Sequence, residues 1–103
     1  MERVKVSAGV EREILAIGEQ LMLVEFSFEQ GGEIDWHSHV HEQAGYVAKG
    51  KLRLLVAEQE FILTEGMSSV VPSNVRHKAI ALEDTVYINA FSPIREDYLR
   101  TNG

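Results

Sequence analysis

Apolar and polar residues alternate along much of this chain with the two-residue period of a β-strand. In residues 21–28, the alternation places Val24, Phe26 and Phe28 on one face and residues such as Glu25 on the other. Similar short stretches predict strands at residues 34–39, 43–48, 51–57, 60–64, 68–71, 76–82 and 85–91. Residues 10–17 fit either a strand or a helix, and residues 94–100 fit one or two helical turns after Ser92-Pro93.

Turn residues separate these predicted strands at short intervals. Lys49-Gly50, Glu65-Gly66 and Glu83-Asp84 mark turns, and Pro72 stops the strand before it. Strands spaced roughly 8–12 residues apart, without helical periodicity between them, predict an all-β sandwich or barrel. The length of 103 residues predicts a single domain over residues 1–103.

The net charge and the apolar content of the chain limit the kinds of molecule and membrane that it can bind. Acidic residues outnumber basic ones by 16 to 10, which gives a net charge of −6 at pH 7. Such a chain offers no basic stripe for phosphates, so we expect neither nucleic acid nor an anionic membrane as its partner. The longest apolar runs are four residues, whereas a membrane span needs about 20. The lack of cysteine excludes disulfides and thiolate chemistry, and it suits a cytoplasmic protein.

The candidate chemistry lies in four histidines, three close together and one apart: His37, His39, His41 and His77. On a regular strand, His37 and His39 project from one face, so both imidazoles could bind one divalent metal ion. Gln43 could add an oxygen from the next strand, and His77 could complete the site from across a barrel. Two surface histidines are the alternative to this metal site, and Glu42 is the alternative to Gln43.

At these residues the sequence resembles the cupin family. The first cupin motif, G-x5-H-x-H-x3-E-x6-G, matches Gly31, His37, His39, Gln43 and Gly50, with Gln in the position that usually holds Glu. The second motif, G-x5-P-x-G-x2-H-x3-N, aligns with Gly66, Pro72, Asn74, His77 and Ala81, with Ala in the position that usually holds Asn. Asn74 stands where the motif has Gly, and Asn tolerates the left-handed backbone that such a Gly often adopts.

The resemblance implies a cupin-type barrel, also called a double-stranded β-helix or jelly roll, with a short C-terminal tail. It also implies one divalent transition metal, Ni, Fe, Mn, Co or Zn, near the barrel mouth. The implied metal ligands are His37, His39, Gln43 and His77. Because Gln43 replaces a carboxylate, the ligand set has one negative charge fewer, which makes the metal a stronger Lewis acid and holds it less tightly.

Two longer strings resemble a narrower group, the small cupins of pectin and uronate breakdown. These strings are HSHVHEQ at residues 37–43 and FSPIREDYL at residues 91–99. Members of that group convert 4,5-unsaturated monouronates into linear keto sugar acids. The resemblance implies that Asn89 and Arg95 are the catalytic positions and that Phe91, Arg95 and Tyr87 bind the substrate.

Asn89 departs from that group, which has Asp in its place. A carboxyl group can shuttle a proton and an amide cannot, so Asn89 can only orient substrate or water. Tyr46, Tyr87 and a metal-bound water are the alternative acid–base groups. By strand alternation, Tyr87 and Phe91 share the face of Asn89.

Arg95 has two interpretations. Its planar guanidinium can bind a substrate carboxylate. It can also be a surface residue that forms an ion pair with Glu96 or Asp97.

The sequence therefore supports three hypotheses of function. The first is a metal-binding cupin that ketonises or isomerises a small sugar acid. The second is an Fe-dependent dioxygenase, since three histidines with open positions suit Fe(II) and O₂. The third is a non-catalytic sugar-binding module, which the amides Gln43 and Asn89 favour. We also expect a homodimer, in which a strand at Arg3–Ser7 pairs with a neighbouring subunit.

Overall fold

The computed structural model describes residues 2–100 as short β-strands followed by one 3₁₀ helix, η1. The strands are β1 (Arg3–Ser7), β2 (Val10–Ile17), β3 (Met22–Phe28), β4 (Glu33–His37), β5 (Glu42–Lys49), β6 (Lys51–Val56), β7 (Gln59–Thr64), β8 (Ser68–Val71), β9 (His77–Ala81) and β10 (Thr85–Ser92). The helix η1 spans Glu96–Arg100. The all-β prediction is confirmed, and residues 94–100 contain a single short 3₁₀ segment.

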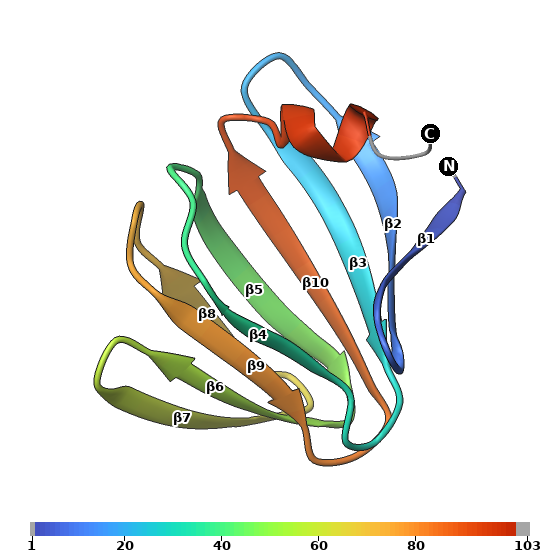
Figure 1. Ribbon diagram of the computed structural model, residues 1–103, viewed down its shortest axis with the longest axis vertical. Helices are drawn as coiled ribbons and strands as arrows, with labels where there is room; N and C mark the ends of the chain where they lie inside the picture. Colours follow the sequence, from blue (N-terminus) through green and yellow to red (C-terminus); the bar gives the residue numbers. More distant parts are fainter. Residues whose placement is uncertain (1, 101–103) are drawn as a thin grey trace.

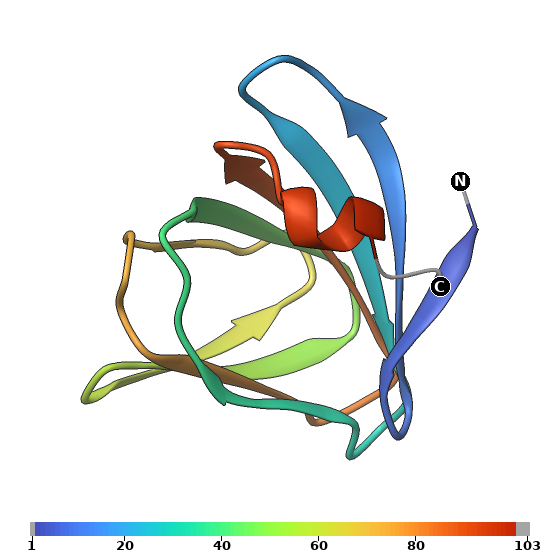
Figure 2. The ribbon, with the colours of Figure 1, turned by 45° about the horizontal axis from the view of Figure 1, so that its top comes forward.

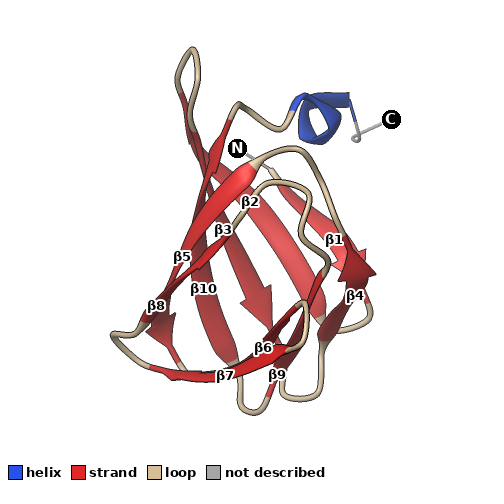
Figure 3. Cartoon of the chain, turned by 90° about the vertical axis from the view of Figure 1, so that its left-hand side faces the viewer, coloured by secondary structure: helices blue, strands red, loops and turns tan. Residues whose placement is uncertain are grey.

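The strands form two antiparallel sheets that curve around a common interior (Figure 1, Figure 2). The order is β1-β2-β3-β10-β5-β8 in the first sheet and β4-β9-β6-β7 in the second. Figure 3 shows η1 near the upper end of the barrel, and its Tyr98 packs against the core and contacts Arg12 of β2. Within residues 2–100, no helix is long and apolar enough to cross a membrane.

The core follows from the alternation of apolar residues. Val24, Phe26 and Phe28 are each 4% exposed or less, as the sequence predicts for one face of β3. Leu52 and Leu54 of β6 are buried in the same way from the second sheet. Burial of these side chains between the sheets is the main stabilising contribution to the barrel.

Residues 10–17, which the sequence left open, form strand β2. The alternation there is strict, with Val10, Arg12 and Ile14 buried and the residues between them less so. β2 pairs with β3 on one side and with β1 on the other. Arg3–Ser7 is therefore a strand as expected, but it pairs within its own chain and forms the end of the six-stranded sheet.

Strand β10, which lies between β3 and β5, carries three of the predicted site residues, Tyr87, Asn89 and Phe91. Its register places Asn89 opposite Gly45 and Phe91 opposite Gln43. A Cβ atom at Gly45 would lie 2.4 Å from the Tyr87 hydroxyl oxygen, so the missing side chain makes room for this phenol. The alternation of β10 buries Tyr87, Asn89 and Phe91 together, as predicted.

Two loops meet at one end of the barrel and place the metal-motif residues. The β4–β5 and β8–β9 loops lie at the upper left of Figure 1. The backbone N–H of Asn74 donates to the carbonyl of His39 at 2.8 Å and joins the two loops. Asn74 has a φ of 65°, which confirms the left-handed backbone predicted for this position.

Candidate metal centre

Three histidines from separate parts of the chain come together where these loops meet. His37 is the last residue of β4, and it lies opposite His77, the first residue of β9. Their ring centroids are 4.1 Å apart, and the His39 ring lies 5.4 Å from His37 and 4.9 Å from His77. The predicted strand at residues 34–39 is wrong beyond His37. His39 therefore reaches the cluster from the loop, not from the face of a strand.

Hydrogen bonds to backbone carbonyls fix the protonation of all three rings. The Nδ1 atoms of His37, His39 and His77 lie 2.9, 2.9 and 2.8 Å from the carbonyl oxygens of residues 35, 41 and 75. A carbonyl oxygen only accepts, so each Nδ1 carries the proton and donates it. In the neutral form of each ring, Nε2 then keeps the lone pair that a metal ion needs.

The donor set fits a divalent transition metal. The potential ligand atoms of the three rings lie within 4.8 Å of one another. No group in the described part of the chain hydrogen-bonds to Nε2 of His39 or of His77, although both atoms are buried. A buried acceptor without a partner is costly, and a metal ion would satisfy both nitrogens at once.

Burial also keeps His39 and His77 in the neutral form that binds metal. Desolvation lowers the pKa of His77 to about 4. Desolvation, and then the positive charge of Arg95, lower the pKa of His39. Both imidazoles are therefore neutral at pH 7.

Gln43, and not Glu42, faces the interior. Gln43 is 6% exposed and lines the same cavity as His37 and His77, whereas Glu42 is exposed. Its Nε2 donates to Oδ1 of Asn89 at 3.0 Å, which leaves Gln43 Oε1 as the atom that could bind a cation. The structure thus brings the predicted Gln43 and Asn89 into direct contact.

The amide nitrogen of Asn89 and the hydroxyl of Tyr87 are the other polar groups that β10 contributes to the cavity. Asn89 is 1% exposed, and its Nδ2 has no hydrogen-bond partner among residues 2–100. The Tyr87 hydroxyl lies 2.9 Å from Ser69 Oγ, and burial raises the pKa of Tyr87. Tyr46, the other candidate tyrosine, is 49% exposed on the outer face and cannot serve the cavity.

Arg95 forms the ion pair with Asp97 that one interpretation expected, but it does so from a buried position. Its Nε and Nη2 donate to the two carboxylate oxygens of Asp97 at 3.1 and 2.9 Å. Arg95 is nevertheless 8% exposed and lines the cavity, so it is not a surface residue. Within the described chain its buried Nη1 has no partner and remains free to donate.

The cavity inside the barrel has a volume of about 210 Å³. Phe91, Tyr87 and Asn89 line it from β10, as predicted. Arg12 of β2 and Tyr98 of η1 also line it, and sequence reasoning missed both. The signal for Arg12 is its strand parity with Val10 and Ile14, which becomes readable only once residues 10–17 are known to be a strand.

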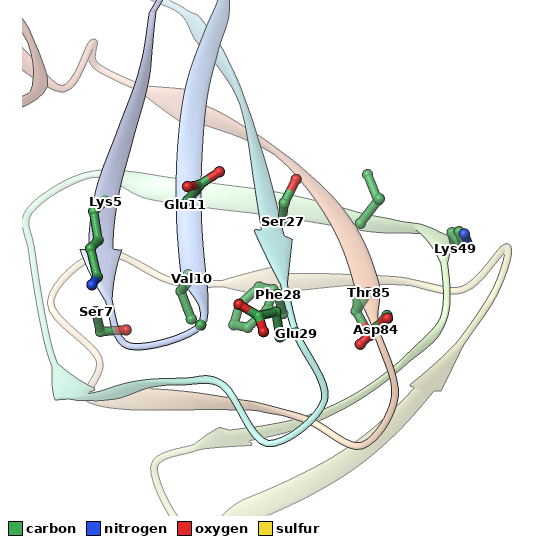
Figure 4. Close-up of a pocket in the computed structure, with 12 residues that line it drawn as sticks. Lys5, Ser7, Val10, Glu11, Ser27, Phe28, Glu29, Lys49, Asp84 and Thr85 are labelled. Carbon is green, nitrogen blue, oxygen red and sulfur yellow. The ribbon is translucent and has the colours of Figure 1, made fainter.

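A larger hollow of about 400 Å³ lies at the turn end of the six-stranded sheet (Figure 4). Lys5 and Lys49 line it together with the acidic residues Glu11, Glu29 and Asp84. Asp84 already accepts a hydrogen bond from the backbone of Gln30 at 2.8 Å. Because the charges are mixed and show no convergence, the candidate site is the interior cavity.

Comparison with known proteins agrees with this geometry. Residues 24–90 match the family model of the cupin domain. This chain belongs to the cupin family, and the cupin-type barrel expected from the motifs is confirmed. A metal-competent histidine cluster at the barrel mouth accompanies that fold.

Within the family, the chain is similar to proteins of pectin degradation. It is 33% identical over 93 residues to the pectin degradation protein KdgF of Dickeya dadantii (strain 3937), covering 88% of this chain and 84% of that protein. The solved structure of KdgF from Halomonas sp. matches with a TM-score of 0.89 and 34% identity, covering 95% and 93% of the two chains. An RmlC-like cupin from Shewanella frigidimarina NCIMB 400 matches with a TM-score of 0.89 and 35% identity, covering 94% and 87%.

Proposed function

We propose that this cupin is a metal-dependent enzyme that converts a 4,5-unsaturated uronic acid into its linear keto form. The observation that carries the proposal is one cavity that combines metal-competent histidines with the buried guanidinium of Arg95. A uronic acid offers a carboxylate for the guanidinium and oxygens for a metal. The similarity to the two KdgF proteins supports this choice of substrate class.

The metal would be held by the residues that the motifs name. His37, His39 and His77 would bind through Nε2, and Gln43 would bind through Oε1. Nitrogen and oxygen donors of this kind suit Ni, Fe, Mn, Co or Zn. When bound, such an ion supplies Lewis acidity at a sugar oxygen.

The side chains of β10 and the tail would hold the sugar. Arg95 donates from its free Nη1 to the carboxylate, while its pair with Asp97 keeps the guanidinium oriented. Asn89 donates from Nδ2 to a hydroxyl or to the ring oxygen. Phe91, 1% exposed, forms an apolar wall, and the Tyr87 hydroxyl lies on the same side of β10.

The reaction is an isomerisation, so its protons must balance. The bond between C1 and the ring oxygen breaks, and the C1 hydroxyl loses a proton and becomes a carbonyl. The ring oxygen becomes the C5 carbonyl as the C4=C5 double bond is lost, and C4 gains a proton. The amides of Asn89 and Gln43 cannot carry protons. We therefore assign Asn89 to orientation and proton transfer to water in the cavity or to the Tyr87 phenol.

The test is incubation of the purified, metal-supplemented protein with the unsaturated monomers of galacturonate and mannuronate. We expect the absorbance of the C4=C5 double bond to fall faster than in buffer, and a keto product to form. A rate equal to that in buffer, with metal occupancy confirmed, would contradict the proposal. A His77→Ala variant serves as the control for metal dependence.

A binding module is the second candidate, and one observation favours it. Gln43 and Asn89, both amides, hydrogen-bond to each other at 3.0 Å, so neither of these two positions supplies an acid–base group. Saturable binding of the unsaturated monomers without turnover would support this alternative. Oxygen uptake with Fe(II) in the same samples would support the dioxygenase hypothesis instead.

We further propose that the protein acts as a homodimer in the cytoplasm. β1 ends the six-stranded sheet and offers an edge for a second copy. Apolar side chains also lie exposed on the outer face of this sheet, among them Leu23, Tyr46 and Val70. The cytoplasmic assignment rests on the cysteine-free composition, which suits a reducing compartment.

A further inference from the structure

We propose that Arg12 is a second carboxylate-binding residue of the cavity, and that Tyr98 of the tail positions both Arg12 and Arg95 for this task. This inference rests on the proposed function, because it concerns how the same cavity recognises a sugar acid. It assigns a binding role to β2 and η1, which lie outside both cupin motifs.

Arg12 is placed in the interior by its strand. It lies on β2 opposite Phe26 of β3, a buried core residue, and it is itself 7% exposed. Its strand neighbours Glu11 and Glu13 have the opposite parity and face outward or lie half-buried. Its guanidinium lies over the Tyr98 ring and lines the cavity, where it can meet a ligand.

The Tyr98 ring holds Arg12 and Arg95 close together. The Arg12 guanidinium carbon lies 3.9 Å from the centroid of this ring, and that of Arg95 lies 4.1 Å from the same centroid. The distance between the two guanidinium carbons is therefore at most the sum of these two distances. Edge-on contacts with Phe26 and Phe91, at 6.5 and 5.9 Å between centroids, fix the ring in turn.

Two guanidinium groups in one small cavity select for an anionic ligand. Arg12 and Arg95 both line the 210 Å³ space that also contains Asn89. Asp97 pairs with Arg95 from its outer side, at 48% side-chain exposure, and does not line the cavity. A planar carboxylate matches the donor geometry of guanidinium groups, and stacking on an aromatic ring limits the directions in which they can donate.

The experiment measures binding rather than turnover. Calorimetry with the metal-supplemented protein compares saturated galacturonate, which cannot be ketonised, with neutral galactose. We expect galacturonate to bind more tightly, and Arg12→Gln to weaken its binding about tenfold or more, because a charge-assisted hydrogen bond is lost. Galactose binding should not change.

Matched variants separate recognition from folding. Arg53→Gln removes an exposed arginine of β6 that pairs with Glu60, and it should leave both affinities unchanged. Arg12→Lys keeps the charge and should retain part of the preference for galacturonate. Tyr98→Phe keeps the stacking ring and should preserve the preference, whereas Tyr98→Leu should reduce it.

The outcomes distinguish this inference from the proposed function. Selective galacturonate binding that depends on Arg12, without turnover of the unsaturated monomer, supports the inference and contradicts the ketonising activity. Equal affinities of the native protein for the two sugars would overturn the inference. An Arg12→Gln variant that folds with normal metal content and keeps the full preference would also overturn it.

Discussion

Position 89 decides what chemistry the cavity can perform. Asn89 lines the cavity and accepts a hydrogen bond from Gln43 through Oδ1, and its buried Nδ2 has no partner among the described residues. An amide can orient a substrate but cannot exchange a proton with it. If position 89 were Asp, the cavity would contain a carboxyl group that can transfer protons, close to the candidate metal ligands.

We predict that Asn89→Asp increases the rate of ketonisation by about 100-fold, the usual contribution of a placed general acid or base. Gln43 Nε2 can still donate to the new carboxylate, so the variant keeps the local hydrogen bond. The measurement is the initial rate of double-bond loss, with Asn89→Ala as the control. An Asp variant no faster than the native protein would show that proton transfer does not pass through this position.

At the residue level, the sequence predicted the site well where spacing constrains it. His37, His39 and His77 were predicted to converge and they do, because turns fixed by Gly31, Pro72 and their neighbours bring the two motifs to one end of the barrel. Arg12 was missed because nothing in its local sequence distinguishes a buried arginine from an exposed one. Its contact with Tyr98 joins positions 86 residues apart in the sequence, and only the folded chain reveals it.

At the level of elements, the turns hold the barrel in register. Gly50 joins β5 to β6 with a φ of 97°, and a Cβ there would lie 2.2 Å from the carbonyl oxygen of Asp84. Gly31 has a similar φ of 85° but nothing within 4 Å of such a Cβ. Substitution of Gly31 therefore measures the cost of a left-handed backbone alone, and substitution of Gly50 measures that cost together with a steric clash.

We predict that Gly50→Ala lowers the free energy of unfolding by about 3 kcal/mol, because it adds a clash to backbone strain. Gly31→Ala, the matched control, should cost only about 1 kcal/mol from strain alone. Urea denaturation of both variants measures the difference. Equal losses of stability would contradict the role assigned to the close approach of Asp84.

Among the elements, strands with clear alternation and flanking turns were predictable, and β2 and η1 were less so. Residues 10–17 satisfy both helical and strand patterns locally, and pairing with β1 and β3 decides between them. In the Ile94–Arg100 segment only Glu96–Arg100 forms η1, and Tyr98 within it lies against two arginines, one of them on β2. Tertiary contacts of this kind are not encoded in a local window.

At the level of the whole molecule, the barrel leaves part of its outer surface suited to association. The six-stranded sheet ends in β1, and large apolar residues on its outer face, such as Leu23 and Val70, are 37% and 59% exposed. An unpaired strand edge beside apolar surface favours contact with a second copy of the sheet. A two-fold arrangement would bring the same surface of both copies into contact.

We predict a solution mass of twice the 11.6 kDa of the chain. Light scattering coupled to size exclusion measures it directly. Val70→Lys should shift the distribution toward the monomer, since it places a charge on the apolar face, while Lys78→Glu on the other sheet should not. A monomeric native protein would contradict the dimer.

The central claim is that three imidazoles and one amide oxygen hold a single metal ion at the barrel mouth. Anomalous diffraction from crystals of the metal-supplemented protein tests it most directly. The account predicts one anomalous peak per chain, about 2.0–2.2 Å from Nε2 of His37, His39 and His77. A metal-supplemented crystal with no peak there, or with its metal bound elsewhere on the chain, would contradict the account.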